Sequence, residues 1–119
     1  YRAAQIALIT PLKDGMNLVA KEYCACTPDD DGVLILSEFA GAAAELADGA
    51  LLVNPCDVDG TAEAIRDAVE MPGEERRERM HRLRQTVQER DVFRWVDDFL
   101  AAGSLGAEAG GKPAPAPQA

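Results

Sequence analysis

The chain has 119 residues, which suits one domain at most and is enough to bury a core. Its formal net charge of -9 disfavours nucleic acid as a partner, because a duplex binder must present a basic surface. No apolar stretch reaches the ~18 residues of a membrane-spanning helix and no charged-then-apolar leader opens the chain, so we expect no membrane partner and a cytoplasmic location.

Short apolar runs alternate with helix-like segments along most of the chain. The runs are rich in Val, Ile and Leu, and we expect strands at residues 6–10, 33–37 and 50–54. We expect helices in the segments that follow, at residues 18–26, 39–47 and 61–70. Either Asp57 or Asp59 could cap the last of these helices. The alternation predicts an α/β fold, a Rossmann-like parallel sheet with flanking helices.

Two further helices are expected beyond residue 72, because apolar residues recur there at helical spacing. These residues are Met80, Leu83 and Val87 in the first helix, and Val92, Trp95, Val96, Phe99 and Leu100 in the second. Trp95 and Phe99 are interpreted as core anchors, and packing against another part of a longer protein is the alternative. Residues 103–119 are rich in Gly, Ala and Pro, so we expect a disordered tail there.

The remaining charged and thiol side chains are interpreted as structural. The arginines of residues 76–84 fit a solvated helix face offset by Glu74, Glu75 and Glu78, with docking of another subunit or lobe as the alternative. Cys24 and Cys26 are too few for a metal site and are expected to be buried small apolar residues rather than half of a disulfide framework.

The segment from Asp14 to Glu22, which reads DGMNLVAKE, carries the clearest functional signal. Gly15 and Asn17 indicate a short loop after the first apolar run, and a helix is expected to begin at Leu18. A helix N-terminus points free N–H groups and the positive end of its dipole at an anion such as a phosphate. Asp14 and Glu22 would then flank that anion as carboxylates able to hold sugar hydroxyls.

The expected fold places this segment at a ligand-binding edge. Ligands of open α/β sheets bind beyond the carboxyl ends of the strands, where residues 13–17, 38–41 and 55–59 should meet. Other interpretations stay open: Asp14 could cap the helix, and Glu22 could be an exposed helix carboxylate. Glu38 fits either a helix end or a wall of the site, and Ser37 is expected to cap the second helix.

Several segments in this order and spacing resemble the trehalose-6-phosphate synthase family of retaining glycosyltransferases. They are DGMNLVAKE (14–22), VLILSEFAGAA (33–43), LLVNP (51–55), DVDG (57–60), Met71-Pro72 and DVFRW (91–95). Cys56 departs from the resemblance, because the family commonly has an aromatic residue there. The resemblance implies that residues 1–102 are the C-terminal part of the nucleotide-sugar-binding lobe of a two-lobed GT-B glycosyltransferase.

The resemblance also implies a reaction. Glucose would pass from a nucleotide diphosphate glucose donor to glucose 6-phosphate with retention, giving trehalose 6-phosphate. The implied donor-binding residues are Asp14, Gly15, Met16, Asn17, Leu18, Val19 and Glu22. Asp14 is the implied catalytic residue and holds the glucosyl hydroxyls with the backbone of residues 15–17. The N–H groups of Leu18 and Val19 would meet the diphosphate, and Glu22 would hold the ribose.

No cofactor and no metal are implied by the resemblance. In the family, upstream Arg and Lys residues bind the diphosphate, and the N-terminal lobe binds the acceptor. The chain alone is therefore expected to be catalytically inactive. The donor base (UDP, ADP or GDP), assembly as a homo-oligomer and a fused phosphatase domain stay open.

Three other functions are compatible with parts of the pattern. A glucosylglycerol-phosphate synthase would share the donor half and differ in its acceptor lobe. A non-catalytic, synthase-like regulatory module would keep the fold, although the intact segment from Asp14 to Glu22 disfavours it. A generic α/β binding domain would require the ordered segments to match by accident.

Overall fold

The computed structural model describes residues 1–27, 29–90 and 92–109, with the side chains of these residues except 92, 95 and 103–109. The chain divides into two compact units, Tyr1–Gln88 and Glu89–Ala119. The described elements are, in order, β1 (Ile6–Ile9), α1 (Leu18–Ala25), β2 (Val33–Ser37), α2 (Ala43–Leu46), β3 (Leu51–Val53), α3 (Val58–Glu70), α4 (Gly73–Glu89) and α5 (Val92–Ala109).

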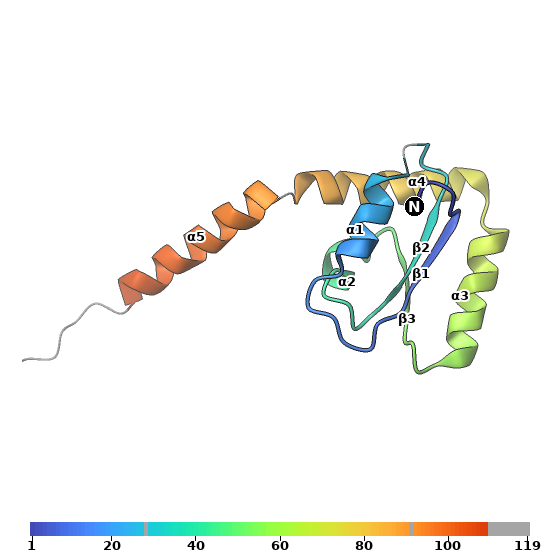
Figure 1. Cartoon of the computed structure of the whole chain (residues 1–119), viewed down its shortest axis with the longest axis horizontal. Coiled ribbons are helices and arrows are strands. Elements are labelled where there is room, and N and C mark those ends of the chain that lie inside the picture. Colours follow the sequence, from blue (N-terminus) through green and yellow to red (C-terminus); the bar gives the residue numbers. More distant parts are fainter. Residues whose placement is uncertain (28, 91, 110–119) are drawn as a thin grey trace, which may run out of the picture. The chain divides into compact units, whose positions relative to one another are not determined.

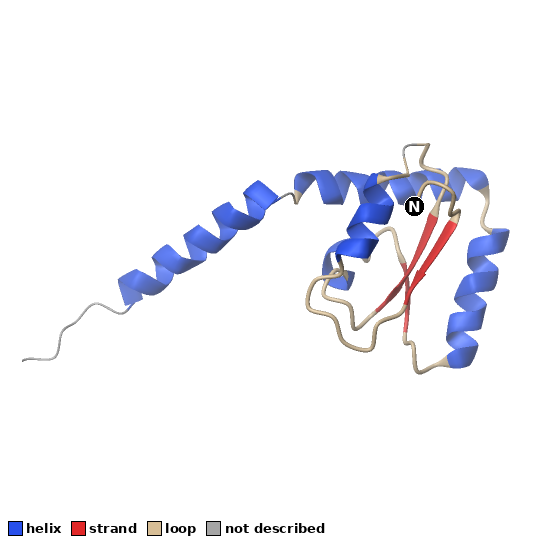
Figure 2. Cartoon of the chain, viewed as in Figure 1, coloured by secondary structure: helices blue, strands red, loops and turns tan. Residues whose placement is uncertain are grey.

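The first unit is built on a parallel three-stranded sheet in the order β1-β2-β3 (Figure 1). Ile35 of the central strand lies opposite Leu8 on one side and Leu51 on the other. Parallel neighbours need crossover connections, which the helices provide. Figure 2 shows α1 and α2 on one side of the sheet and α3 on the other. The predicted α/β class with a parallel sheet and flanking helices is confirmed.

The central strand β2 is buried on both faces. Successive side chains of a strand point to opposite faces. Accordingly, Leu34 and Leu36 pack in a core cluster with Tyr23 of α1 and Met80 of α4. Val33 and Ile35 belong to a second cluster, which contains Ala68 of α3 and Val53 of β3. The two clusters hold helices on both faces of the sheet.

Most element boundaries lie close to the predicted ones. Strand β2 is as predicted, whereas β1 and β3 are shorter than residues 6–10 and 50–54. Helix α3 begins at Val58 rather than at Thr61, because the Asp57 side chain accepts a hydrogen bond from the Gly60 N–H, 3.0 Å away. Of the two acidic candidates, Asp57 is therefore the N-cap.

The predicted helix at residues 39–47 is wrong in its first half. Helix α2 covers only Ala43–Leu46, and residues 39–42 form turns around a bridge at residue 40. One long-range contact and one local contact hold these residues out of a helix. Ala40 forms a parallel bridge with Asp14, and the Ser37 hydroxyl accepts a hydrogen bond from the Phe39 N–H. Ser37 thus closes a turn instead of capping a helix.

Helix α5 extends farther than the composition indicated. Its backbone is helical through Ala109, past residue 103 where the predicted tail begins. Residues 110–119 lie outside the described part of the chain, and the tail stays a prediction. Alanine and leucine within residues 101–109 favour helix enough to carry it past Gly103 and Gly106. Phe99 is 64% exposed, so its interpretation as a core anchor is wrong, while the side chain of Trp95 lies outside the description.

The arginines of α4 pair both within the helix and with a distant acidic turn. Arg79 contacts Glu75 and Arg82 contacts Glu78, at 2.9 and 3.0 Å, as the interpretation of a charge-offset helix face requires. Two further pairs were not foreseen. They join Arg84 to Asp30 at 2.8 Å and Arg76 to Asp31 at 3.2 Å. These pairs fix the turn between α1 and β2 onto α4.

The cysteines differ in exposure and all three are free thiols. Cys24 is buried, as predicted, and burial raises the pKa of its thiol to about 12, which keeps it protonated and unreactive at neutral pH. Cys26 is only partly buried and Cys56 is exposed. None of the helices in the described ranges has the length and hydropathy needed to cross a membrane.

Replacing Asp30 by Asn tests the pairing of the acidic turn with α4. Asn removes the charge but tolerates the left-handed backbone of this residue, whose φ is 51°. We expect the free energy of unfolding to fall by about 1 kcal/mol, and the loss to shrink at high salt. Urea unfolding at low and high NaCl measures both. Asp29→Asn, at an exposed neighbouring carboxylate, is the control, and an equal loss in both variants would contradict the role of the pair.

Candidate functional site

The loops that follow the strands open at one edge of the sheet (Figure 1). This edge is where the carboxyl ends of parallel strands meet and where open α/β sheets bind ligands. Two of the loops are in direct contact, since Asp14 after β1 bridges to Ala40 after β2. The candidate site is built on this contact.

The Asp14 carboxylate is held in place by its own loop. The Met16 N–H donates to Asp14 Oδ1 at 3.1 Å, and the Asn17 side-chain amide donates to Asp14 Oδ2 at 2.9 Å. Asn17 in turn caps α1, because its Oδ1 accepts from the Ala20 N–H at 2.9 Å. A carboxylate can accept further hydrogen bonds beside these. Asp14 is therefore fixed relative to the first turn of α1 and keeps acceptor capacity for a ligand.

The alternative in which Asp14 itself caps α1 is excluded, because Asn17 occupies that position. Helix geometry leaves the N–H groups of the first turn without partners in the helix, and Asn17 satisfies only that of Ala20. Leu18 and Val19 are 58% and 47% exposed. An anion approaching their N–H groups meets an open surface and the positive end of the helix dipole.

Glu22 lies one turn farther along α1 and is exposed. Its Oε2 accepts a hydrogen bond from the Tyr1 hydroxyl at 2.7 Å, and this bond raises the pKa of Tyr1. The partner of Lys21 is a residue of another helix and not its neighbour Glu22. Lys21 forms an ion pair with Glu45 of α2 at 2.9 Å, which assigns it to the packing of α1 on α2.

The loop after β2 makes backbone contacts with the loop that carries Asp14. The Gly41 N–H donates to the Asp14 backbone carbonyl at 2.7 Å, beside the bridge to Ala40. Sequence reasoning placed residues 38–41 at this edge but missed the contact between the loops. Glu38 is exposed there. A glycine just after a strand was the only local sign of such a close approach.

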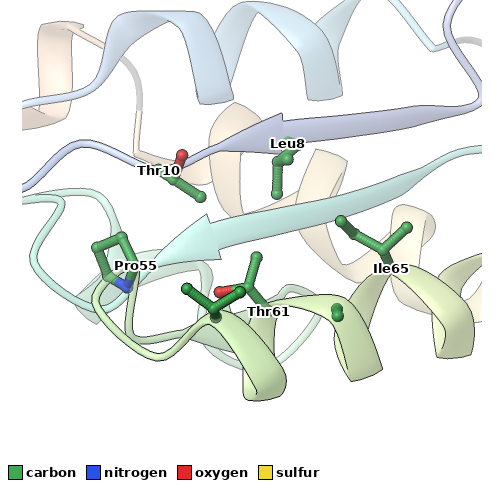
Figure 3. Close-up of a pocket in the computed structure, with 7 residues that line it drawn as sticks. Leu8, Thr10, Pro55, Thr61 and Ile65 are labelled. Atoms are coloured by element: carbon green, nitrogen blue, oxygen red, sulfur yellow. The ribbon is translucent and has the colours of Figure 1, made fainter.

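The loop after β3 borders a separate pocket of about 280 Å³. Figure 3 shows Leu8 and Thr10 from the β1 side facing Thr61 and Ile65 of α3 across it. Its full lining is Leu8, Thr10, Pro55, Val58, Thr61, Ala62 and Ile65. The lining is uncharged and contains none of the predicted donor-binding residues, so the pocket is unsuited to an anion. In the described ranges no cluster of three His, Cys, Asp or Glu side chains could hold a metal.

Residues 1–103 match the sequence model of the protein family described as glycosyltransferase family 20. The chain belongs to this family. A trehalose-6-phosphate synthase of Sinorhizobium fredii is 57% identical over 101 residues, which are 84% of this chain and 22% of that protein. The resemblance to the trehalose-6-phosphate synthase family is thereby confirmed.

Solved structures agree. An α,α-trehalose-phosphate synthase (UDP-forming) of Burkholderia xenovorans, in complex with glucose-6-phosphate, matches with a TM-score of 0.79 and 51% identity, covering 85% of this chain and 22% of that one. An E. coli structure bound with UDP-2-fluoro glucose matches with a TM-score of 0.79 and 45% identity, covering 85% and 22%. The predicted fold class is therefore confirmed for this chain, which matches one part of these synthases and spans about a fifth of the length of the proteins it matches.

Substitutions of Asn17 separate its two contacts. Asn17→Ala removes the cap of α1 and should lower the free energy of unfolding by about 1 kcal/mol. Asn17→Ser keeps a capping oxygen and should lose much less, although its side chain is too short to reach Asp14. Urea unfolding of both variants measures the difference. Equal losses would show that the cap contributes nothing to stability.

Proposed function

We propose that the chain is the C-terminal donor-binding portion of an α,α-trehalose-phosphate synthase. The reaction transfers glucose from a nucleotide diphosphate glucose to glucose 6-phosphate with retention. The observation that carries the proposal is the fixed Asp14 carboxylate beside the open first turn of α1, in a chain 57% identical to a trehalose-6-phosphate synthase. Residues 1–102 form part of the nucleotide-sugar-binding lobe in this proposal.

Asp14 and the backbone of residues 15–17 hold the glucosyl hydroxyls. The two hydrogen bonds from Met16 and Asn17 orient the carboxylate before a sugar arrives, which lowers the cost of ordering it on binding. At Gly15 an added Cβ would meet nothing within 4 Å, so this position offers room for close approach of a ligand. Both features fit a site for a sugar ring.

The N–H groups of Leu18 and Val19 bind the diphosphate, and Glu22 binds the ribose. Breaking the anomeric bond leaves negative charge on the diphosphate, and donors already in position stabilise that charge best. Glu22 already accepts a hydroxyl hydrogen bond from Tyr1 at 2.7 Å. A ribose hydroxyl would make the same type of contact, so the observed bond supports this role chemically.

The complete reaction needs groups outside these residues. A helix N-terminus at an exposed position contributes only ~0.3–1 kcal/mol to binding of an anion. The positive side chains that balance the rest of the diphosphate charge, and those that bind the acceptor, belong to other parts of a longer protein. We therefore propose that the chain alone is inactive, and that the longer protein works in the cytoplasm, where nucleotide sugars and sugar phosphates occur.

An activity assay of the longer protein that contains this chain tests the proposal. We expect turnover of UDP-glucose with glucose 6-phosphate, the ligand types held by the two solved relatives, and none by the chain alone. ADP-glucose and GDP-glucose are assayed in parallel, because the base is read elsewhere. Turnover only with glycerol 3-phosphate would move the assignment to glucosylglycerol-phosphate synthesis. No turnover with any pair would indicate a non-catalytic module.

Two substitutions in the longer protein separate the proposed roles of the carboxylates. Asp14→Asn should lower kcat more than it weakens donor binding, because contacts at the reacting sugar can strengthen in the transition state. Glu22→Gln should mainly raise the donor KM. Losing one hydrogen bond to a charged acceptor costs ~1.5–3 kcal/mol, so each effect should be about tenfold or more.

Steady-state kinetics with varied donor distinguish these outcomes. Asp67→Asn, at an exposed carboxylate of α3, is the matched control and should behave as wild type. Wild-type constants for Asp14→Asn and Glu22→Gln would remove both residues from the site.

A further inference from the structure

We propose that Gly41 is a positioning residue of the donor site, which acts through the loop that carries Asp14. This inference rests on the proposed function, because its main readout is the nucleotide-sugar donor. Gly41 does not belong to the segment from Asp14 to Glu22, and no donor contact is assigned to it. It lies in the turn between β2 and α2.

The Gly41 backbone is packed against the peptide bond between Gly15 and Met16. A Cβ placed on Gly41 would lie 2.0 Å from the Gly15 carbonyl oxygen, 2.5 Å from its carbon and 3.1 Å from the Met16 nitrogen. Separations below 3.0 Å essentially never occur for a real Cβ. All three atoms are backbone, so no side-chain rotation can relieve the overlap.

The requirement for glycine here is spatial and not conformational. Within the described residues no glycine has a positive φ, so the backbone of Gly41 is one that alanine could adopt. The close approach itself is held by two contacts on the same pair of loops. The Gly41 N–H donates to the Asp14 carbonyl at 2.7 Å, and Ala40 bridges to Asp14.

The peptide that Gly41 supports is the one that orients the catalytic carboxylate. The Met16 N–H donates to Asp14 Oδ1 at 3.1 Å, and Asn17 joins the other carboxylate oxygen to the cap of α1. A methyl group at position 41 would push the Gly15 carbonyl by about 1 Å, the difference between 2.0 and 3.0 Å. The proposed sugar-binding backbone and the Asp14 carboxylate would both move with it.

Gly41→Ala in the longer protein tests this inference. A displacement of about 1 Å at a reacting centre can cost ~10²-fold in rate, so we expect kcat/KM for the donor to fall by up to about 10²-fold. The donor KM should rise, and the acceptor KM should stay unchanged. A merely structural defect would reduce the active fraction without this asymmetry.

Gly49→Ala is the matched control. Its added Cβ would also clash, at 2.5 Å from Leu83 Cγ and 2.7 Å from the Arg79 carbonyl oxygen, but these atoms belong to α4. We expect this variant to melt at a lower temperature with both KM values unchanged. The inference is overturned if Gly41→Ala behaves in the same way as Gly49→Ala.

A second variant decides the matter if Gly41→Ala does not fold. Ser37→Ala adds no atom and removes the acceptor that holds the Phe39 N–H at 3.1 Å, which loosens the turn that carries Gly41. It should raise the donor KM in the same direction by a smaller factor, again without changing the acceptor KM. An unchanged donor KM in this variant would overturn the inference.

Hydrogen exchange distinguishes failure of this inference from failure of the proposed function. If the wild-type protein transfers no sugar, the proposed function fails, and exchange of the amides in residues 14–20 still reports on the contact. Gly41→Ala, or Ser37→Ala in its place, should speed that exchange and Gly49→Ala should not. Equal exchange in the position-41 or position-37 variant and the control would overturn the inference without any activity measurement.

Discussion

The burial of β2 on both faces is the constraint on which the rest of the structure depends. Leu34 and Leu36 face one core cluster, and Val33 and Ile35 face the other. Parallel sheets are covered by helices on both faces, and their strands are typically apolar on both faces, as β2 is. The chain must then cross over after every strand, and its loops open at the same edge. The burial of β2 therefore brings together the loops that form the proposed site.

Local signals were sufficient to predict the sheet and the start of α1. Each strand is a short apolar run followed by a polar or proline-containing loop, and Asn17 is a strong N-cap just before a helix-forming stretch. The start of α3 was ambiguous only because Asp57 and Asp59 are equally good caps in sequence. The late start of α2 could not be predicted, because the pairing of Ala40 with Asp14 overrides the helix propensity of its neighbours.

The candidate site likewise has local features that the sequence indicates and long-range contacts that it does not. The contacts among Asp14, Met16 and Asn17 lie within one short loop, so this segment could be singled out from the sequence, and its role in donor binding stays a prediction. The contacts that hold this segment in the fold join residues far apart in the chain, and a single sequence carries no signal for such pairs. The ion pair of Lys21 with Glu45 and the hydrogen bond from the Gly41 N–H to the Asp14 carbonyl are examples.

The contact between the loop that carries Gly15 and the loop that carries Gly41 constrains how this part of the chain can evolve. The group that would exclude a side chain at position 41 is the carbonyl of residue 15, which every amino acid possesses. A second substitution at position 15 therefore offers no compensation, unlike a clash between two side chains. Drift at position 41 would have to be accompanied by a shift of the backbone itself, so the two loops can diverge only together.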